Sequence, residues 1–105
     1  MEPVKDRNKG ILELKRFMAP FKAPIQNWYV GITHNPFERV FFDHKVPLEH
    51  GAHKAIQAES ADIARAIEAF FIEKLKTDGG QSGGDERSVF VYAFLKTKDT
   101  DPPLR

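Results

Sequence analysis

The amino-acid sequence predicts an α+β domain in which helices flank a small three-stranded sheet, either mixed or antiparallel. Segments with helical periodicity or a helix cap alternate with segments rich in aromatic and β-branched residues, an order typical of helices packed on one sheet. The chain has 105 residues, a length at which one core forms without disulfide or metal support. We expect a single domain with an N-terminal helix and connector (1–26), a core (27–96) and a tail (97–105).

The first helix is expected from about residue 6 to residue 18. Ile11, Leu14 and Met18 recur there at helical spacing. Two prolines follow within a few residues, and proline interrupts a helix. The chain should therefore continue as an extended connector.

The first strand is expected over residues 27–33, which are rich in aromatic and β-branched residues. Every second residue, beginning at Trp28, would form an apolar face. The opposite face would carry Tyr29, Gly31 and Thr33, and therefore a phenol, bare backbone and a hydroxyl. We expect one face to join a core and the other to present polar atoms.

A second helix should begin directly after this strand and run from about Pro36 to His44. Asn35 is a favoured N-cap residue, proline is favoured at the first helical position, and Glu38 at the third position completes a capping signature. The helix must end before Pro47, because the residue preceding a proline avoids helical geometry.

Three further elements are expected before the tail. Residues 54–58 form a short candidate strand, and Ser60 caps a helix over residues 61–76 that carries a continuous apolar stripe. Residues 88–96 are apolar on both faces, which is typical of a strand covered on both sides and so central in its sheet. The tail after this strand should be poorly ordered.

A glycine-rich segment, residues 77–87, connects the last helix to the last strand. Gly79 or Gly80 could end the helix in the left-handed conformation. Alternatively, successive backbone N–H groups could bind an anion, or the loop could form a binding lip.

Composition excludes several classes of site. There are 16 basic and 15 acidic residues and a net charge of +1, so any contact with nucleic acid must come from a local patch. The chain has no cysteine, which excludes thiolate chemistry and is compatible with a cytoplasmic protein. No apolar run is long enough to span a membrane.

His50 and His53 lack a predicted helix to align them and are expected to be solvated loop residues.

The segment Tyr-Val-Gly-Ile-Thr at residues 29–33 is followed by Arg39, eight residues after Gly31. This pattern resembles the second half of the GIY-YIG nuclease motif, in which a Tyr-x-Gly strand leads into a helix that carries an arginine. The resemblance implies a GIY-YIG-like fold that cuts phosphodiester bonds in DNA or RNA with one divalent ion, Mg²⁺ or Mn²⁺. Tyr29, Gly31 and Arg39 would be the tyrosine, glycine and arginine of the motif.

The same resemblance implies further site residues. Glu68 would be the metal-binding glutamate, because it follows Ala64 in an Ala-x-x-x-Glu setting like that of the family. His44 would be catalytic, although it lies five residues after Arg39 where the family usually has four. Thr33, together with the glycine of the motif, would contact the substrate.

The first half of the motif, a Gly-Ile-Tyr strand, does not precede residue 28. The C-terminal strand contains Tyr92, which would supply the second tyrosine if this strand occupied the missing position, as in a circular permutation. That arrangement requires Tyr29 and Tyr92 to lie on the same face of the sheet.

Two other functions are open at this point. The domain could be a degenerate relative that binds nucleic acid without cutting it, or a non-catalytic protein-interaction module that uses the sheet and the glycine-rich loop. The residues also have ordinary structural roles open to them. Arg39 is spaced to pair with Asp43 on its own helix, and Glu68 could be a carboxylate that simply flanks the core.

Overall fold

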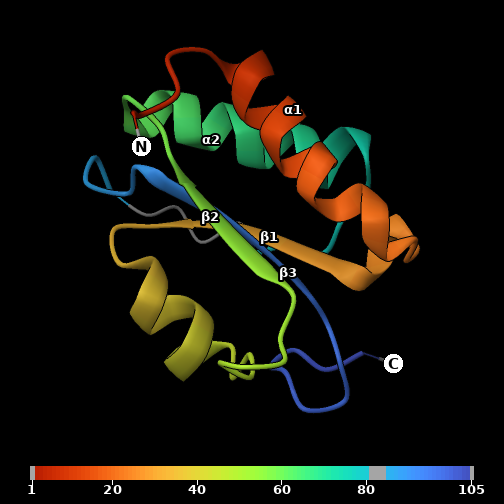
Figure 1. Ribbon diagram of the computed structural model, residues 1–105. Helices are drawn as coiled ribbons and strands as arrows, with labels where there is room; N and C mark the ends of the chain where they lie inside the picture. The colour runs from red at the N-terminus through yellow and green to blue at the C-terminus, as the bar shows by residue number, and fades with distance from the viewer. Residues whose placement is uncertain (1, 81–84, 105) are drawn as a thin grey trace.

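A three-stranded antiparallel sheet lies between two helical layers (Figure 1). The computed structural model describes residues 2–80 and 85–104. Helices α1 and α2 cover one face of the sheet, and the short π-helix η3 covers the other. The helical elements are α1 (Arg7–Met18), η1 (Ala19–Phe21), η2 (Ile25–Asn27), η3 (Glu38–Asp43), α2 (Ala61–Ala69) and η4 (Phe70–Lys74). The strands are β1 (Trp28–Thr33), β2 (His53–Gln57) and β3 (Phe90–Leu95).

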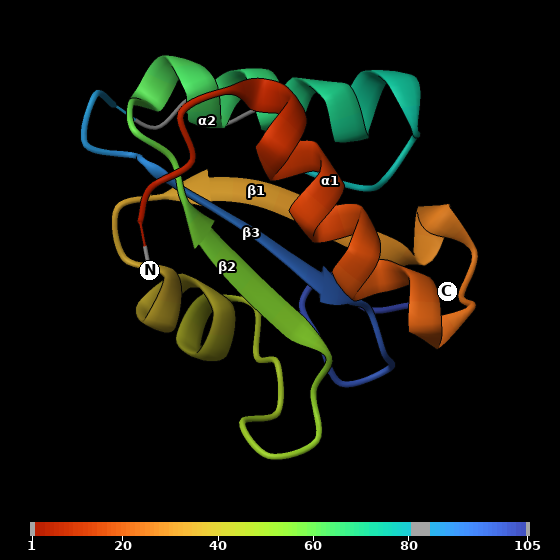
Figure 2. The same cartoon turned by 45° about the horizontal axis from the view of Figure 1, so that its top comes forward.

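The strand order is β1-β3-β2, and β3 runs antiparallel to both neighbours (Figure 2). The predicted α+β class is confirmed, and the sheet is antiparallel rather than mixed. The last strand is central, as its apolar residues on both faces indicated. Val91 and Ala93 belong to the core beneath α1 and α2, whereas Tyr92 and Phe94 pack in the layer of η3.

The larger hydrophobic core fills the space between the sheet and helices α1 and α2. Trp28 and Val30 of β1 pack there with Leu14, Ile67 and Phe71, and each of these side chains is essentially fully buried. Full burial of one such side chain contributes roughly 1.5–3 kcal/mol. The apolar face predicted for β1 therefore lies in the core.

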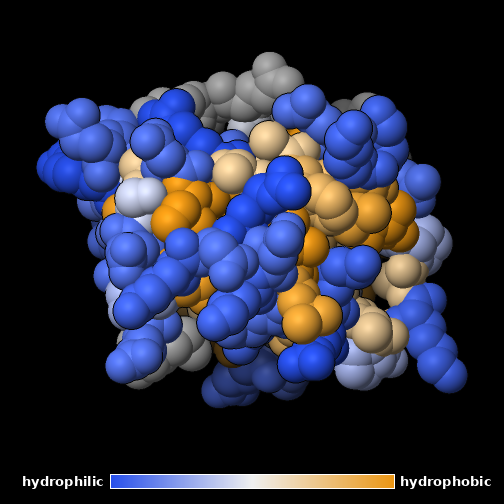
Figure 3. Space-filling model, turned by 90° about the horizontal axis from the view of Figure 1, so that it is seen from above, coloured by the Kyte–Doolittle hydropathy of each residue, from blue (hydrophilic) through white to orange (hydrophobic). Residues whose placement is uncertain are grey.

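A glycine inside α1 brings the two helices of this layer close together. A Cβ atom at Gly10 would overlap Cδ1 of Ile67 and lie 3.2 Å from its Cγ1. Glycine costs about 1 kcal/mol relative to alanine inside a helix, and the close approach of α1 to α2 offsets that cost. The outer face of this layer is mostly hydrophilic (Figure 3), and no helix in the described part of the chain is long and apolar enough to cross a bilayer.

Side chains cap the start of each of the three main helical segments. The backbone N–H groups of Lys9, Glu38 and Ile63 donate to Asp6 Oδ1 (2.9 Å), Asn35 Oδ1 (3.1 Å) and Ser60 Oγ (3.2 Å), respectively. Such caps satisfy N–H groups that have no partner within the helix. The caps predicted at Asn35 and Ser60 are confirmed.

The π-helices η3 and η4 end in the same way. Each is followed by a C-cap residue and then by a lysine in the left-handed region, Lys45 with φ 57° and Lys76 with φ 68°. The next amide then bonds back six residues, from Val46 N to Val40 O (3.1 Å) and from Thr77 N to Phe71 O (3.0 Å). The helices predicted to end at residues 44 and 76 thus finish as π turns.

The chain after η4 follows the outer edge of β1. The prediction that a glycine here would adopt the left-handed cap is wrong, because Lys76 adopts it. Asp78 O instead accepts the N–H of Val30 at 3.0 Å, and a Cβ at Gly79 would lie 2.6 Å from Val30 O. Glycine is therefore needed for close approach to the strand. The predicted anion-binding or lip role concerns a loop whose residues 81–84 lie outside the described part of the chain.

β2 begins one residue earlier than the predicted segment 54–58. His53 is a strand residue whose ring packs edge-on against Phe41, with ring centroids 4.8 Å apart, and burial lowers its pKa. The expectation of a solvated loop histidine is therefore wrong for His53. At the other end, Ala58 leaves the strand and forms a parallel bridge with Val4.

The segment predicted as a poorly ordered tail folds back onto the domain. Thr100 is 4% exposed, and the backbone N–H of Leu104 donates to Thr97 O at 2.8 Å. Asp101 N donates to His44 O at 2.8 Å. The expectation of disorder is wrong as far as residue 104, because main-chain hydrogen bonds hold this segment beneath the sheet.

Candidate active site

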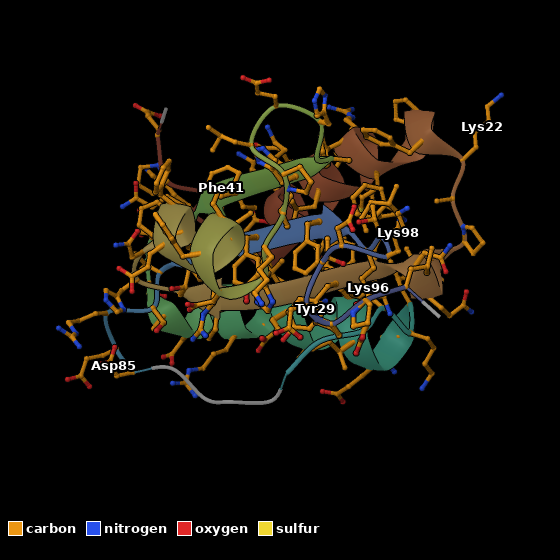
Figure 4. The ribbon with its side chains drawn as sticks, turned by 90° about the horizontal axis from the view of Figure 1, so that it is seen from below. Lys22, Tyr29, Phe41, Asp85, Lys96 and Lys98 are labelled. Atoms are coloured by element: carbon orange, nitrogen blue, oxygen red, sulfur yellow. The ribbon has the colours of Figure 1, made fainter. Side chains whose placement is uncertain are left out.

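Two tyrosines lie on the face of the sheet that η3 covers. Tyr29 of β1 lies opposite Phe94 of β3, and Gly31 lies opposite Tyr92; directly opposed residues in an antiparallel pair project from the same face. The rings of Tyr29 and Tyr92 are nearly parallel, with centroids 6.3 Å apart. The permuted arrangement required this common face. Figure 4 shows this face from below, with Tyr29 over β1 and Phe41 of η3 near β2.

Gly31 provides the space that Tyr92 occupies. A Cβ atom at Gly31 would lie 2.6 Å from Cζ of Tyr92 and would also overlap its hydroxyl oxygen. The aromatic ring of one strand therefore lies across the bare backbone of its neighbour. Any larger residue at this position would displace the phenol.

His44 holds the hydroxyl of Tyr92. The His44 Nε2 atom lies 2.8 Å from Tyr92 Oη, and Nδ1 lies 2.7 Å from the carbonyl oxygen of Asp101. Burial lowers the pKa of His44, and the nearby carbonyl of Asp101 acts in the opposite direction. Since a carbonyl only accepts, a neutral His44 donates through Nδ1 and accepts the Tyr92 hydroxyl proton at Nε2.

The π geometry of η3 sets the direction of His44. In a π-helix the N–H bonds to the carbonyl five residues earlier, and His44 N donates to Arg39 O at 3.0 Å. In this π turn, residues five apart in the sequence are hydrogen-bonded in the way that residues four apart are in an α-helix. The extra residue between Arg39 and His44, a departure from the family spacing, is absorbed by the helix.

Arg39 lies at the border of this cluster. Its Nη1 pairs with Asp43 Oδ2 at 3.3 Å, and both side chains are substantially exposed, so the pair contributes only about 0.3–0.5 kcal/mol. The Nε atom is buried and has no hydrogen-bond acceptor in the described residues. The positive charge lowers the pKa of Tyr29 and of Tyr92, so the guanidinium acts electrostatically on both phenols.

Glu68 lies in α2, which packs against β1, and acts on the tyrosines through its charge. Its carboxyl is half-buried, and this burial raises its pKa to about 7, while the charge of Arg65 acts to lower it. The charge of Glu68 raises the pKa of both Tyr29 and Tyr92. Burial is the larger cause of the raised pKa at each phenol, so both are neutral at physiological pH.

Sequence reasoning missed three residues around the tyrosines. The Gly80 backbone N–H, hydrogen-bonded to Tyr29, lowers the pKa of this phenol, whereas the charge of Asp78 raises it. Asp78 Oδ2 in turn accepts from Lys96 Nζ at 3.0 Å. Asp101 contributes its carbonyl to His44. Two of these contacts use main-chain atoms, which no side-chain pattern could have revealed.

Of the remaining predicted residues, Thr33 is engaged in a local contact. Thr33 is buried, and its Oγ1 accepts from the Asn35 N–H at 3.1 Å, which gives it a structural role at the end of β1. No group of three or more potential metal-ligating side chains occurs within residues 2–80 and 85–104. Glu68, the metal ligand that the resemblance implies, therefore belongs to no such group among the described residues.

A separate groove of about 520 Å³ runs along α1. Its lining includes Lys9, Glu13, Arg16 and Lys54, none of which belongs to the tyrosine cluster. It lies on the side of the sheet that α1 covers, opposite to η3. The groove therefore does not extend the candidate site.

Comparison with known proteins adds no relative. No protein-family model, curated protein or solved structure matches the chain. The family resemblance in the sequence therefore stays a prediction. The functional proposal rests on the geometry of the site.

Proposed function

We propose that this chain is a GIY-YIG-like domain that hydrolyses phosphodiester bonds of DNA or RNA with Mg²⁺ or Mn²⁺. The observation that carries the proposal is the convergence of Tyr29, Tyr92, His44 and Arg39 on one face of the sheet, with the charge of Glu68 acting on both phenols. These side chains come from two strands and two helical segments far apart in the sequence. Ordinary core packing does not require a histidine, an arginine and a carboxylate together at this place.

The sheet topology supports the permuted form of the motif. β3 is antiparallel to β1 and places Tyr92 opposite Gly31. A strand bearing the second tyrosine is therefore adjacent to the Tyr-x-Gly strand, although it comes last in the chain. The π turn between Arg39 and His44 accounts for the departure in spacing.

Arg39 is suited to bind a phosphate oxygen. Guanidinium groups bind phosphate with paired hydrogen bonds. The buried Nε of Arg39 has no acceptor in the described residues, and a buried donor left unpaired costs about 1–3 kcal/mol. A phosphate oxygen would satisfy this donor, and the exposed pair with Asp43 is weak enough to be exchanged.

Glu68 is suited to hold the metal ion. A nearby cation would offset the burial that raises its pKa to about 7 and would keep the carboxylate ionised. Mg²⁺ is commonly held by one or two carboxylates together with water and substrate phosphate oxygens, so a single glutamate is sufficient. When bound, the ion would neutralise charge that develops on the phosphate.

Tyr92 and His44 provide a route for a proton. Because Tyr92 donates its proton to His44 Nε2, its oxygen lone pairs are free to accept a proton from a water molecule. The raised pKa of Tyr92 disfavours a standing phenolate, so the hydroxyl proton would pass to His44 as the new one arrives. General base assistance of this kind typically contributes 10²–10⁴-fold in rate.

A nicking assay with matched variants tests the proposal. Purified protein with Mg²⁺ or Mn²⁺ should nick supercoiled plasmid or structured DNA or RNA, and Glu68→Gln or Arg39→Ala should reduce the rate at least about 100-fold. Glu73→Gln removes an exposed carboxylate of η4 and should leave the rate unchanged. Cleavage that survives both site variants would show that a contaminant did the cutting. DNA or RNA binding without any cleavage would identify a degenerate, non-cutting relative.

A protein-interaction module is the second candidate function. Phe37 and Phe42 of the η3 region are 57% and 68% exposed, and the net charge of +1 supplies no general attraction for nucleic acid. If the protein neither cuts nor binds nucleic acid, this function is favoured. A cytoplasmic location, which the absence of cysteine fits, is part of either proposal.

A further inference from the structure

The segment after β3 is a loop ordered by its own hydrogen bonds, which we name the C-terminal strap (residues 97–104). The Thr100 hydroxyl oxygen accepts the Thr97 N–H at 3.0 Å and lies 2.8 Å from Pro102 O. Thr100 is 4% exposed, and the Leu104 N–H donates to Thr97 O at 2.8 Å. One buried threonine thus closes the strap on itself.

The strap makes two hydrogen bonds to the same residue of the site. Asp101 N donates to His44 O at 2.8 Å, and Asp101 O lies 2.7 Å from His44 Nδ1. Both atoms of Asp101 belong to the main chain. Both hydrogen bonds depend on the backbone path of the strap. The exposed Asp101 side chain acts on His44 only through its charge, which opposes the burial that lowers the pKa of His44.

We propose that the C-terminal strap fixes the tautomer of His44 and so determines the direction of the Tyr92 hydrogen bond. With the proton on Nε2, the bare Nδ1 would face the Asp101 carbonyl oxygen, and two lone pairs at 2.7 Å repel each other. The carbonyl therefore holds the proton on Nδ1 and leaves Nε2 as an acceptor for the Tyr92 hydroxyl.

The tautomer of His44 decides whether the Tyr92 hydroxyl donates a hydrogen bond to His44 or accepts one from it. In the tautomer that the strap selects, Tyr92 donates to His44 and its oxygen keeps lone pairs free to accept a proton. In the other tautomer His44 would donate to that oxygen, and the Tyr92 proton would point away from His44 and could not be passed to it. This consequence for catalysis rests on the proposed function, whereas the tautomer itself does not. Asp101 is thus a positioning residue that acts through His44.

Nitrogen NMR of the full-length protein labelled in its histidines tests the proposal at a pH at which His44 is neutral. The chemical shifts of ring nitrogens distinguish protonated from bare atoms, and a His44→Gln spectrum assigns the signals. We expect His44 to carry its proton on Nδ1. Thr100→Val, which keeps the shape of the buried side chain but removes the strap's hydroxyl contacts, should produce a mixture of tautomers. Lys98→Ala, which removes an exposed side chain of the strap, should leave the His44 signals in the wild-type form.

Two results would overturn the proposal: a wild-type His44 protonated on Nε2, or a folded Thr100→Val protein whose His44 tautomer is unchanged. If the protein cuts nucleic acid, kcat of Thr100→Val should fall about tenfold with KM unchanged, and Lys98→Ala should match wild type. If it does not cut, the proposed function fails while the NMR result still decides the role of the strap. The two failures are therefore distinguishable.

Discussion

Gly31 and Tyr92 face each other across neighbouring strands, and the absence of a side chain at one is what admits the ring of the other. The glycine of a sequence motif thus has a defined steric purpose. The phenol it admits is also the one that His44 binds. Gly31 therefore makes room for the ring whose hydroxyl is hydrogen-bonded to His44.

Gly31→Ala should destabilise the protein by about 1–3 kcal/mol, as is usual when a methyl group is forced into a packed site. The added Cβ would overlap the Tyr92 ring and push its hydroxyl away from His44. Urea unfolding measures the loss. In a Tyr92→Leu background the same substitution should cost much less, because the overlapping ring atoms are gone; equal costs in both backgrounds would contradict the steric account.

Glu68→Gln should make the protein more stable at pH 8 while it removes metal binding. The folded-state pKa is about 7, against an ordinary value of 4.5, so the folded state binds more protons between these values. Wild-type stability is therefore lost as pH rises from about 4.5 to about 7. A neutral glutamine avoids this loss, and we expect a gain of about 1 kcal/mol at pH 8, since solvent screens a half-exposed carboxyl. At pH 4 the two proteins should be equally stable.

Mg²⁺ should raise the thermal stability of wild type but not that of Glu68→Gln. A ligand that binds only the folded state stabilises it by mass action. Thermal unfolding at pH 8 with and without Mg²⁺ measures the effect, and Glu73→Gln serves as the matched control. An equal Mg²⁺ shift in all three proteins would exclude Glu68 as the ligand.

His44 should make stability depend on pH in the opposite sense to Glu68. Burial lowers its pKa below the ordinary value of 6.5, so the unfolded state takes up a proton first as the pH falls. The contribution of His44 is present above pH 6.5 and is lost as pH falls from there to the folded-state pKa. Urea unfolding of wild type and His44→Gln from pH 8 to pH 5 should show the stability difference moving against wild type. A difference independent of pH would contradict this assignment.

Lys76→Gly should stabilise the protein by about 0.5–1 kcal/mol. Lys76 has φ 68°, a conformation that strains residues with a Cβ atom and suits glycine, although glycine also makes the unfolded chain more flexible. Urea unfolding should show the gain. Lys74→Gly, inside η4, should instead cost about 1 kcal/mol.

Much of the fold could be predicted because its signals are local. Asn35 and Ser60 predict helix starts because their side chains can accept hydrogen bonds from the first free backbone N–H groups. The apolar residues on both faces of β3 predict its central place in the sheet. The π turns and the left-handed lysines could not be predicted in this way, because they depend on how each helix end meets the sheet. His53 was placed in a loop because its packing against Phe41 is a tertiary contact.

In the candidate site, too, some residues were indicated by the sequence, whereas others act through contacts that only the folded structure makes. The family resemblance indicated Tyr29, Arg39, Glu68 and Tyr92; the structure places the two tyrosines on one face of the sheet, and the charges of Arg39 and Glu68 act on both phenols. Asp101 escaped notice because it acts through backbone atoms, and the segment that contains it was expected to be disordered. Side-chain patterns cannot report a hydrogen bond that any residue could make.

The central place of β3 also has a consequence for synthesis on the ribosome. Among the described strands, β1 and β2 do not pair with each other but are joined through β3, so the three-stranded sheet cannot assemble until β3 has left the exit tunnel. Contacts between such distant segments slow folding. Tyr92 and the strap follow in the same stretch, and a nascent chain therefore holds neither a sheet nor a complete site until residues 90–104 have emerged.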